Sequence, residues 1–206
     1  MTTPKLLIIM SYFLIVQSII RRCPPKLSLN LPNLSFLSAK DESTYSATCL
    51  RLSTISTLES INAGKNYIEI EFPPSRKSDL SVTETLDANR EFVRRFISKW
   101  SHFREDLWVV FPDASEANLA RNSEPWKAGI SFTITSIAAA VKSYKEKKPK
   151  FIVAVNPGFN VEEWIDLENL DDGDIPFVIV NGNIDRVSVS YSFRDHDVIH
   201  CSNVIL

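Results

Sequence analysis

Between about residue 64 and residue 185 the chain alternates short apolar runs with longer amphipathic segments, and this order constrains the fold more than any other feature. Short runs rich in Val, Ile and Phe are typical of strands, and apolar residues repeated every three to four positions are typical of helices. Strands that alternate with helices predict an α/β, Rossmann-like fold, here with a mostly parallel sheet of about five strands. The expected strands are 66–72, 107–111, 130–135, 151–155 and 177–180, and the expected helices are 54–63, 81–100, 113–122, 136–148 and 161–170.

The strands differ in how they are expected to lie in the sheet. The runs "LWVVF" at 107–111 and "FIVAV" at 151–155 are apolar throughout, as central strands of a parallel sheet are. In the run "IEIEF" at 68–72, apolar residues alternate with Glu69 and Glu71. A period of two indicates a strand with one face in water, so we place this strand at an edge of the sheet.

The first 58 residues have the composition of a targeting leader in two parts. The signal-like part, 1–20, contains an apolar run at 6–20 that is shorter than the roughly 20 residues of a membrane-spanning helix. The transit-like part, 21–58, has seven Ser, four Thr and five basic residues but only two acids. This order resembles the bipartite leader of algae with complex plastids, so we expect plastid import and no stable transmembrane span in the mature protein. A signal anchor with a stem in the secretory pathway is the alternative.

The remaining chain divides at about residue 186. Residues 59–186 carry the strand–helix alternation and are expected to form one α/β domain. Residues 187–206 are polar and aromatic without either period, which predicts an irregular tail. Two interpretations of this tail stay open. It contributes a final strand, or it is foreign sequence and the domain is truncated at its C-terminus.

Polar residues follow three of the predicted strands. Asp113 and Glu116 come after the second strand, Asn156 after the fourth and Asn181 after the fifth. The carboxyl ends of parallel strands meet at one edge of an open sheet, where ligands usually bind. We therefore predict a candidate site made of these four residues, in which the two carboxylates are available as acid, base or metal ligands.

A structural role competes for the same residues. Asp113 and Glu116 are three positions apart, as in a capping box, and the same spacing recurs at 81–84 and 160–163. Because three helices would start in the same way, capping is the leading interpretation for Asp113 and a role in chemistry is the alternative. Asn156, which precedes a proline, is likewise typical of a turn.

Several common kinds of site do not occur in the sequence. There are five glycines and no G-x-G-x-x-G or G-x-x-x-x-G-K-[ST] motif, so no cofactor is predicted. Two of the three histidines, His196 and His200, lie in the tail, and the domain offers no Ser–His–Asp or Cys–His set. No dedicated metal site is predicted. The net charge of −2 does not favour nucleic acid as a partner.

Five pieces, "IEIEFPP", "TETLDANREFVRRF", "VVFPDASEANLA", "FIVAVNPGF" and "PFVIVNGNID", occur in this order between residues 58 and 185. Their order and spacing resemble a plastid domain of unknown function from plants, algae and cyanobacteria. That family includes the Low Photosystem II Accumulation protein (third of that name) and the extension of a plastid adenylate kinase. The resemblance implies a plastid location and, for one member, a role in photosystem II assembly. It supplies no catalytic residues, and it ends at about Arg186.

These observations lead to two hypotheses about function. The first is a plastid protein that is not an enzyme and acts through protein contacts as an auxiliary or assembly factor. Its process would be photosystem II accumulation, with thylakoid or photosystem assembly components as partners. The alternative is a small-ligand or nucleotide-binding α/β enzyme with its site at the carboxyl edge of the sheet.

Overall fold

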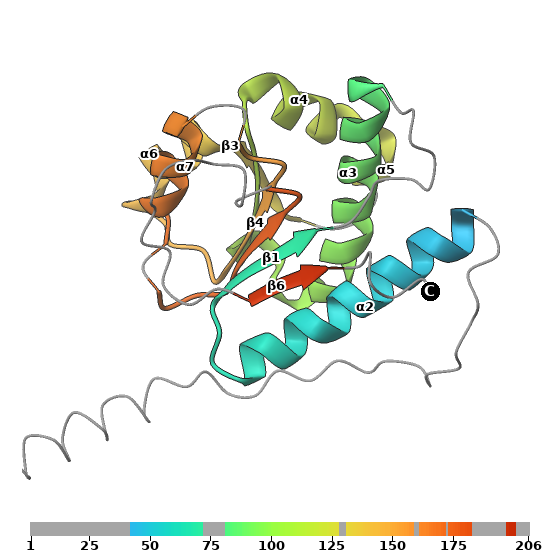
Figure 1. The fold of residues 1–206 in the computed structure, drawn as a ribbon. Coiled ribbons are helices and arrows are strands. Elements are labelled where there is room, and N and C mark those ends of the chain that lie inside the picture. Colours follow the sequence, from blue (N-terminus) through green and yellow to red (C-terminus); the bar gives the residue numbers. More distant parts are fainter. Residues whose placement is uncertain are drawn as a thin grey trace, which may run out of the picture.

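The computed structural model describes residues 42–71, 81–127, 131–158, 161–171, 173–182 and 197–200. This part of the chain forms a parallel sheet of six strands in the order β3-β2-β4-β5-β1-β6, with helices on both faces (Figure 1). The predicted α/β, Rossmann-like fold is therefore confirmed. The signal-like segment and the "FPP" strand end at 72–74 lie outside the described residues.

The elements follow one another in the predicted alternation. The strands are β1 (Tyr67–Glu71), β2 (Leu107–Phe111), β3 (Thr133–Ser136), β4 (Phe151–Val155), β5 (Phe177–Val180) and β6 (Asp197–His200). The helices are α2 (Glu42–Asn62), α3 (Val82–Ile97), α4 (Ala114–Asn122), α5 (Glu124–Lys127), α6 (Ile137–Tyr144) and α7 (Val161–Glu168), with a 3-10 segment, η1 (Ser98–Asp106). Helices α2, α3 and α4 cover one face of the sheet, and α6 and α7 cover the other (Figure 1).

The two strands predicted to be central have every residue buried. Side chains of a strand alternate between the faces, so each of these strands serves two apolar cores. Val109 and Val153 face the core under α2, α3 and α4, and Trp108 and Ile152 face the core under α6 and α7. The unbroken apolar runs are therefore explained by burial on both faces.

Helix α2 is longer than the sequence pattern predicts. The helix expected over 54–63 is only its last part, because the helix begins at Glu42. Its buried face carries several Ser and Thr residues, which hides the apolar period; the buried Thr54 hydroxyl donates to the Leu50 carbonyl at 2.7 Å. The composition of residues 42–58 predicts a leader, but these residues lie in a helix that packs on α3 and β1. The α/β domain therefore begins before residue 59.

Strand β1 is not the edge strand with a wet face that its alternation predicts. It lies between β5 and β6, and Glu69 is only 2% exposed. Ile68 and Ile70 face the core under α2, while Glu69 points to the opposite face, where α7 packs. Gly182 leaves room for this carboxylate, since a Cβ atom at that position would lie 2.9 Å from Glu69 Oε1. Both faces of β1 are therefore buried, and the alternation in its sequence reflects an apolar face with Ile68 and Ile70 and an opposite face that carries Glu69.

The tail expected to be irregular, 187–206, contributes the sixth strand. Residues 197–200 form β6, which pairs in parallel with β1, with Ile68 opposite Asp197 and Glu71 opposite His200. Of the two interpretations of the tail, the structure favours the final strand. Across the described helices, none has the length and apolar character needed to cross a bilayer.

Candidate functional site

The candidate site lies at the carboxyl ends of β2 and β4, which are neighbours in the sheet. The chain leaves these two strands toward opposite faces. After β2 it forms α4, which packs on the same face as α2 and α3, and after β4 it next forms α7 on the other face. In an open α/β sheet, such a divergence opens a crevice at the strand ends, and ligands usually bind there.

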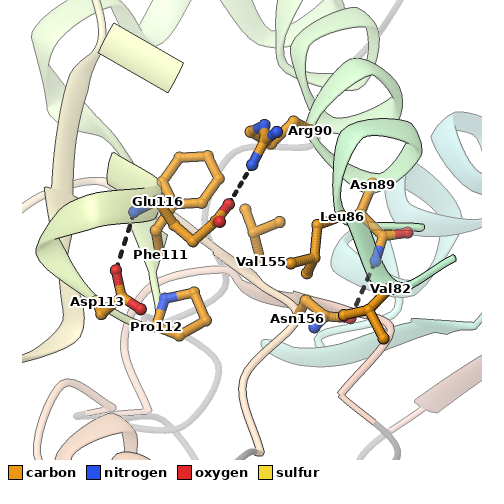
Figure 2. A pocket seen from close by; sticks show the side chains of 10 residues that line it. All are labelled: Val82, Leu86, Asn89, Arg90, Phe111, Pro112, Asp113, Glu116, Val155 and Asn156. Atoms are coloured by element: carbon orange, nitrogen blue, oxygen red, sulfur yellow. Dashed lines mark hydrogen bonds and ion pairs between the residues drawn. The ribbon is translucent and has the colours of Figure 1, made fainter. Parts of the chain in front are cut away.

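A cavity of about 290 Å³ occupies this crevice between α3 and the start of α4 (Figure 2). This volume is close to the lower limit of about 300 Å³ for small-molecule sites. Its lining combines five apolar residues with five polar ones, and small-molecule sites likewise combine apolar walls with polar groups that fix the orientation of the ligand. The apolar residues are Val82, Leu86, Phe111, Pro112 and Val155, and the polar residues are Asn89, Arg90, Asp113, Glu116 and Asn156.

Asp113 caps helix α4. Its backbone is extended, and its Oδ1 accepts a hydrogen bond from the backbone N–H of Glu116 at 2.9 Å. At the start of α3, Ser81 and Glu84 form the complete capping box predicted from the sequence, in which the glutamate also bonds back to the cap. Asn160, predicted to start α7 in the same way, lies outside the described residues. The capping interpretation of Asp113 is therefore confirmed, and Glu116 has another partner.

The partner of Glu116 is Arg90, which reaches across the cavity from α3 (Figure 2). One terminal nitrogen of the guanidinium contacts Glu116, and the other contacts Asp87 on the same helix. The side chains of Arg90 and Glu116 are 15% and 18% exposed, so their ion pair is largely shielded from solvent. The pair ties α3 to α4 along one wall of the cavity. Together with Asp113, it places two carboxylates and one guanidinium in the lining of the cavity.

Asn156 and Asn181, the residues that follow β4 and β5, both have left-handed backbones, with φ angles of 49° and 52°. Asn is one of the few residues other than Gly that adopt this conformation routinely. The backbone of each residue still bonds to the neighbouring strand. The backbone N–H of Asn156 donates to the Val180 carbonyl, and the backbone N–H of Asn181 donates to the Ile70 carbonyl, both at 2.8 Å. The chain therefore turns sharply away from the sheet directly after its last pairing bond.

Three side-chain amides connect these strand ends through α3. Asn181 Nδ2 donates to Asn89 Oδ1 at 2.9 Å, and Asn89 Nδ2 donates to Asn156 Oδ1 at 2.9 Å. Asn89 is 1% exposed and Asn181 is 9% exposed. We call Asn181, Asn89 and Asn156 the amide chain. It holds two left-handed turns and one helix in a fixed relation beside the cavity.

The structure brings three of the four predicted site residues to the cavity, namely Asp113, Glu116 and Asn156. The fourth, Asn181, is not in the lining and is connected to it through Asn89. The sequence interpretation missed Asn89 and Arg90, which come from the middle of α3. The sequence did contain a signal for Asn89. This polar residue lies on the same helix face as the apolar Leu86 and Val93, at the spacing of buried positions.

The polar groups at the cavity are suited to recognition by hydrogen bonds and charge. Arg90 and the Asn156 amide nitrogen donate, and the carboxylates of Asp113 and Glu116 accept. Carboxylate oxygens are also the ligands of Mg²⁺ and Ca²⁺. Among the described residues, however, no three His, Cys, Asp or Glu side chains are grouped so that they could hold a metal ion. The lining as described contains no Ser, Cys, His or Lys.

Comparison with known proteins gives one match. Residues 46–198, from within α2 to within β6, match the family model described as a domain of unknown function (DUF1995). No curated protein and no solved structure matches the chain. The match covers the whole described sheet except the last two residues of β6, and therefore includes every residue of the cavity.

Proposed function

The chain belongs to the DUF1995 family, a family of domains of unknown function. We propose that this domain is a binding module for a small, largely apolar molecule. The observation that carries the proposal is the cavity of about 290 Å³ where the chain leaves β2 and β4 toward opposite faces. This is the place where open α/β sheets bind ligands. The apolar walls would supply affinity, and the few polar groups would orient the ligand.

Binding without catalysis is supported by how the polar groups are used. Asp113 caps α4, and Glu116 is held by Arg90. A general acid or base has to exchange a proton with its substrate, and a nucleophile needs a neighbouring base. Within the described lining, the carboxylates are committed to structural partners, and no nucleophile with a neighbouring base accompanies them. The domain would therefore recognise its ligand and leave it unchanged.

The proposal can be tested by filling the cavity from its exposed rim. Val82 lines the cavity and is 70% exposed, so Val82→Trp would occupy the opening without disturbing the core. Leu119 on α4 is 53% exposed and does not line the cavity, which makes Leu119→Trp the matched control. A panel of nucleotides, divalent metals and small apolar compounds would be screened for a rise in unfolding temperature. A ligand at 100 times its Kd should stabilise the folded state by about 2.7 kcal/mol.

A ligand of the cavity should stabilise the wild type and Leu119→Trp but not Val82→Trp. Two results would oppose the proposal: a wild type that no compound stabilises, or a ligand whose effect is the same in both Trp variants. Since both substitutions are at exposed positions, each variant should unfold within about 0.5 kcal/mol of the wild type without ligand.

The second candidate function is that of an auxiliary factor in the plastid, acting through protein contacts in photosystem II accumulation. It is supported by the composition of the first 41 residues and by the sequence resemblance to plastid proteins. It is also supported by two exposed apolar residues one helical turn apart on α7, Val161 and Ile165, which are 47% and 48% exposed. Contiguous apolar patches mark surfaces that bind other proteins, and this pair would lie at the centre of such a patch.

This second proposal has two tests. A fluorescent protein fused after residue 41 should enter plastids; its delivery to the secretory pathway would oppose the proposal. Affinity purification from plastids should recover thylakoid or photosystem assembly proteins with the wild type, and less of them with Val161→Ser/Ile165→Ser. Equal recovery with both would exclude this face of α7 as the contact.

A further inference from the structure

We propose that the ligand of the cavity is a neutral molecule with a carbonyl group, and that Asn156 binds this group through an N–H that the amide chain holds in place. The inference rests on the proposed function of the cavity and specifies the chemistry that the cavity selects. Asn156 is assigned the contact with the ligand. Asn89 is assigned the role of positioning residue.

The hydrogen bonds of the amide chain fix which end of the Asn156 side chain faces the cavity. Asn181 donates to Asn89 Oδ1, so the nitrogen of Asn89 is directed to Asn156, and Asn156 must offer its oxygen there. Its Nδ2 is then on the other branch of the planar amide, on the side of Pro112 and Asp113 (Figure 2). In the part of the chain that the structure describes, this nitrogen has no hydrogen-bond acceptor.

An unpaired donor on the wall of a cavity calls for an acceptor on the ligand, because a polar group that is desolvated without a partner costs free energy. Burial keeps the amide chain from rearranging, since Asn89 is 1% exposed and bulk solvent cannot replace a lost partner. The left-handed backbone of Asn156, with φ of 49°, further restricts where its side chain can point.

The charges around the cavity decide what kind of acceptor is favoured. In the lining, two carboxylates, Asp113 and Glu116, stand against the one guanidinium of Arg90, which is paired with Glu116 and, outside the lining, with Asp87. An anionic ligand would be repelled by this excess of negative charge. An ammonium ligand would be attracted by the carboxylates, but it has no acceptor for the hydrogen bond that Asn156 Nδ2 offers. A neutral amide fits both, because its carbonyl accepts from Asn156 and its N–H can donate to a carboxylate.

The test uses three compounds with the same apolar body and different polar groups: benzamide, benzoate and benzylammonium. Their Kd values for the full chain would be measured by ligand-observed NMR titration. We expect the wild type to bind benzamide most tightly. In Asn156→Asp, an oxygen still accepts from Asn89 while a second oxygen replaces the nitrogen that faces the ligand. We expect this variant to bind benzamide about tenfold more weakly and to prefer benzylammonium, as one hydrogen bond becomes a contact between two acceptors.

The role of Asn89 is tested by Asn89→Asp. The new carboxylate still accepts from Asn181, but it now presents an oxygen to Asn156, whose amide should rotate so that its own oxygen faces the cavity. The preference should therefore change from benzamide to benzylammonium although residue 156 is unchanged. The added charge alone would strengthen benzylammonium and leave neutral benzamide unchanged, whereas rotation of the Asn156 amide should also weaken benzamide. If Asn89→Asp does not fold, Asn156→Asp carries the test by itself.

The outcomes separate this inference from the proposed function. A wild type that prefers benzoate or benzylammonium, or an order of affinities that is the same in the wild type and Asn156→Asp, would overturn the inference. In that case binding that is lost in Val82→Trp would still support the cavity as the binding site. If none of the three compounds binds and the wider panel is also without effect, the proposed function itself fails.

Discussion

Replacing Asn89 by leucine should destabilise the domain strongly, although the two side chains have the same number of non-hydrogen atoms and the same branching. Asn89 makes two hydrogen bonds of 2.9 Å, one to each of the other members of the amide chain. Each bond contributes about 1 kcal/mol net. The substitution also leaves Asn181 Nδ2, on a residue only 9% exposed, without this acceptor, and such a desolvated group costs about 1–3 kcal/mol.

The bond to Asn156 adds little to the loss, because Asn156 is less buried and water can satisfy its oxygen. The bond to Asn181 and the desolvated donor together give a loss of about 2–4 kcal/mol. In a chain of this size, 1 kcal/mol corresponds to roughly 2–4 °C in Tm. The free energy of unfolding would be measured by urea titration of the wild type and Asn89→Leu, with the slope of the transition checked for equality. Asn118→Leu on α4 is the control: Asn118 is exposed and only accepts from Arg121, so its loss should be below about 0.5 kcal/mol.

A loss below about 1 kcal/mol in Asn89→Leu would refute this reasoning, because it would mean that neither strand end depends on the amide bonds. A gain in stability would refute it more strongly. It would show that an apolar side chain fits this position better than Asn89, and that the two amide bonds do not stabilise the domain.

Three further predictions concern stability. Asp113→Ala removes the side-chain cap of α4 and should cost about 1 kcal/mol in a urea titration; no loss would mean that the cap is not needed. Gly182→Ala places a Cβ atom 2.6 Å from the Ile179 side chain, so it should cost about 1–3 kcal/mol, and an unchanged Tm would contradict the close packing there. Lys150 Nζ lies 2.7 Å from Asp106 Oδ2, and this hydrogen bond lowers the pKa of the Asp106 carboxyl. The stability that the pair adds is therefore present above the unfolded-state pKa and is lost as the pH falls through the folded-state pKa. Lys150→Met should therefore make the fall of Tm toward acid pH shallower, by a small amount because the pair is solvated, and an identical slope would argue against the pair.

The sequence was sufficient for the fold class because the central strands have a simple physical signature. A strand buried on both faces by two layers of helices has to be apolar at every position, and the runs at 107–111 and 151–155 meet this condition. The starts of α3 and α4 were equally predictable, since an N-cap depends on residues within three positions of each other.

The errors occurred where polar residues are buried. The first part of α2 hides its core face behind serines and threonines, whose hydroxyls can bond to the helix itself, as Thr54 does to Leu50. Glu69 suggested a wet face on β1, but it lies in a pocket of space that the missing side chain of Gly182 leaves open. No periodicity in the sequence reports such long-range contacts.

The site was predicted in part for the same reason. Strand ends can be located from the sequence, and parallel strands bring their ends to one edge, so Asp113, Glu116 and Asn156 were predicted together. Arg90 and Asn89 come from a helix, and their partners are 26 and 67 positions away in the chain. Only the packing of α3 across the sheet reveals that they complete the cavity.

A crystal structure of the protein soaked with benzamide would show most directly whether the cavity at the carboxyl ends of β2 and β4 binds a ligand. We expect density for the compound between Phe111 and Val155, with its carbonyl oxygen within hydrogen-bonding distance of Asn156 Nδ2. Density for benzamide only at other places, with the cavity unchanged from the crystal without the compound, would contradict it.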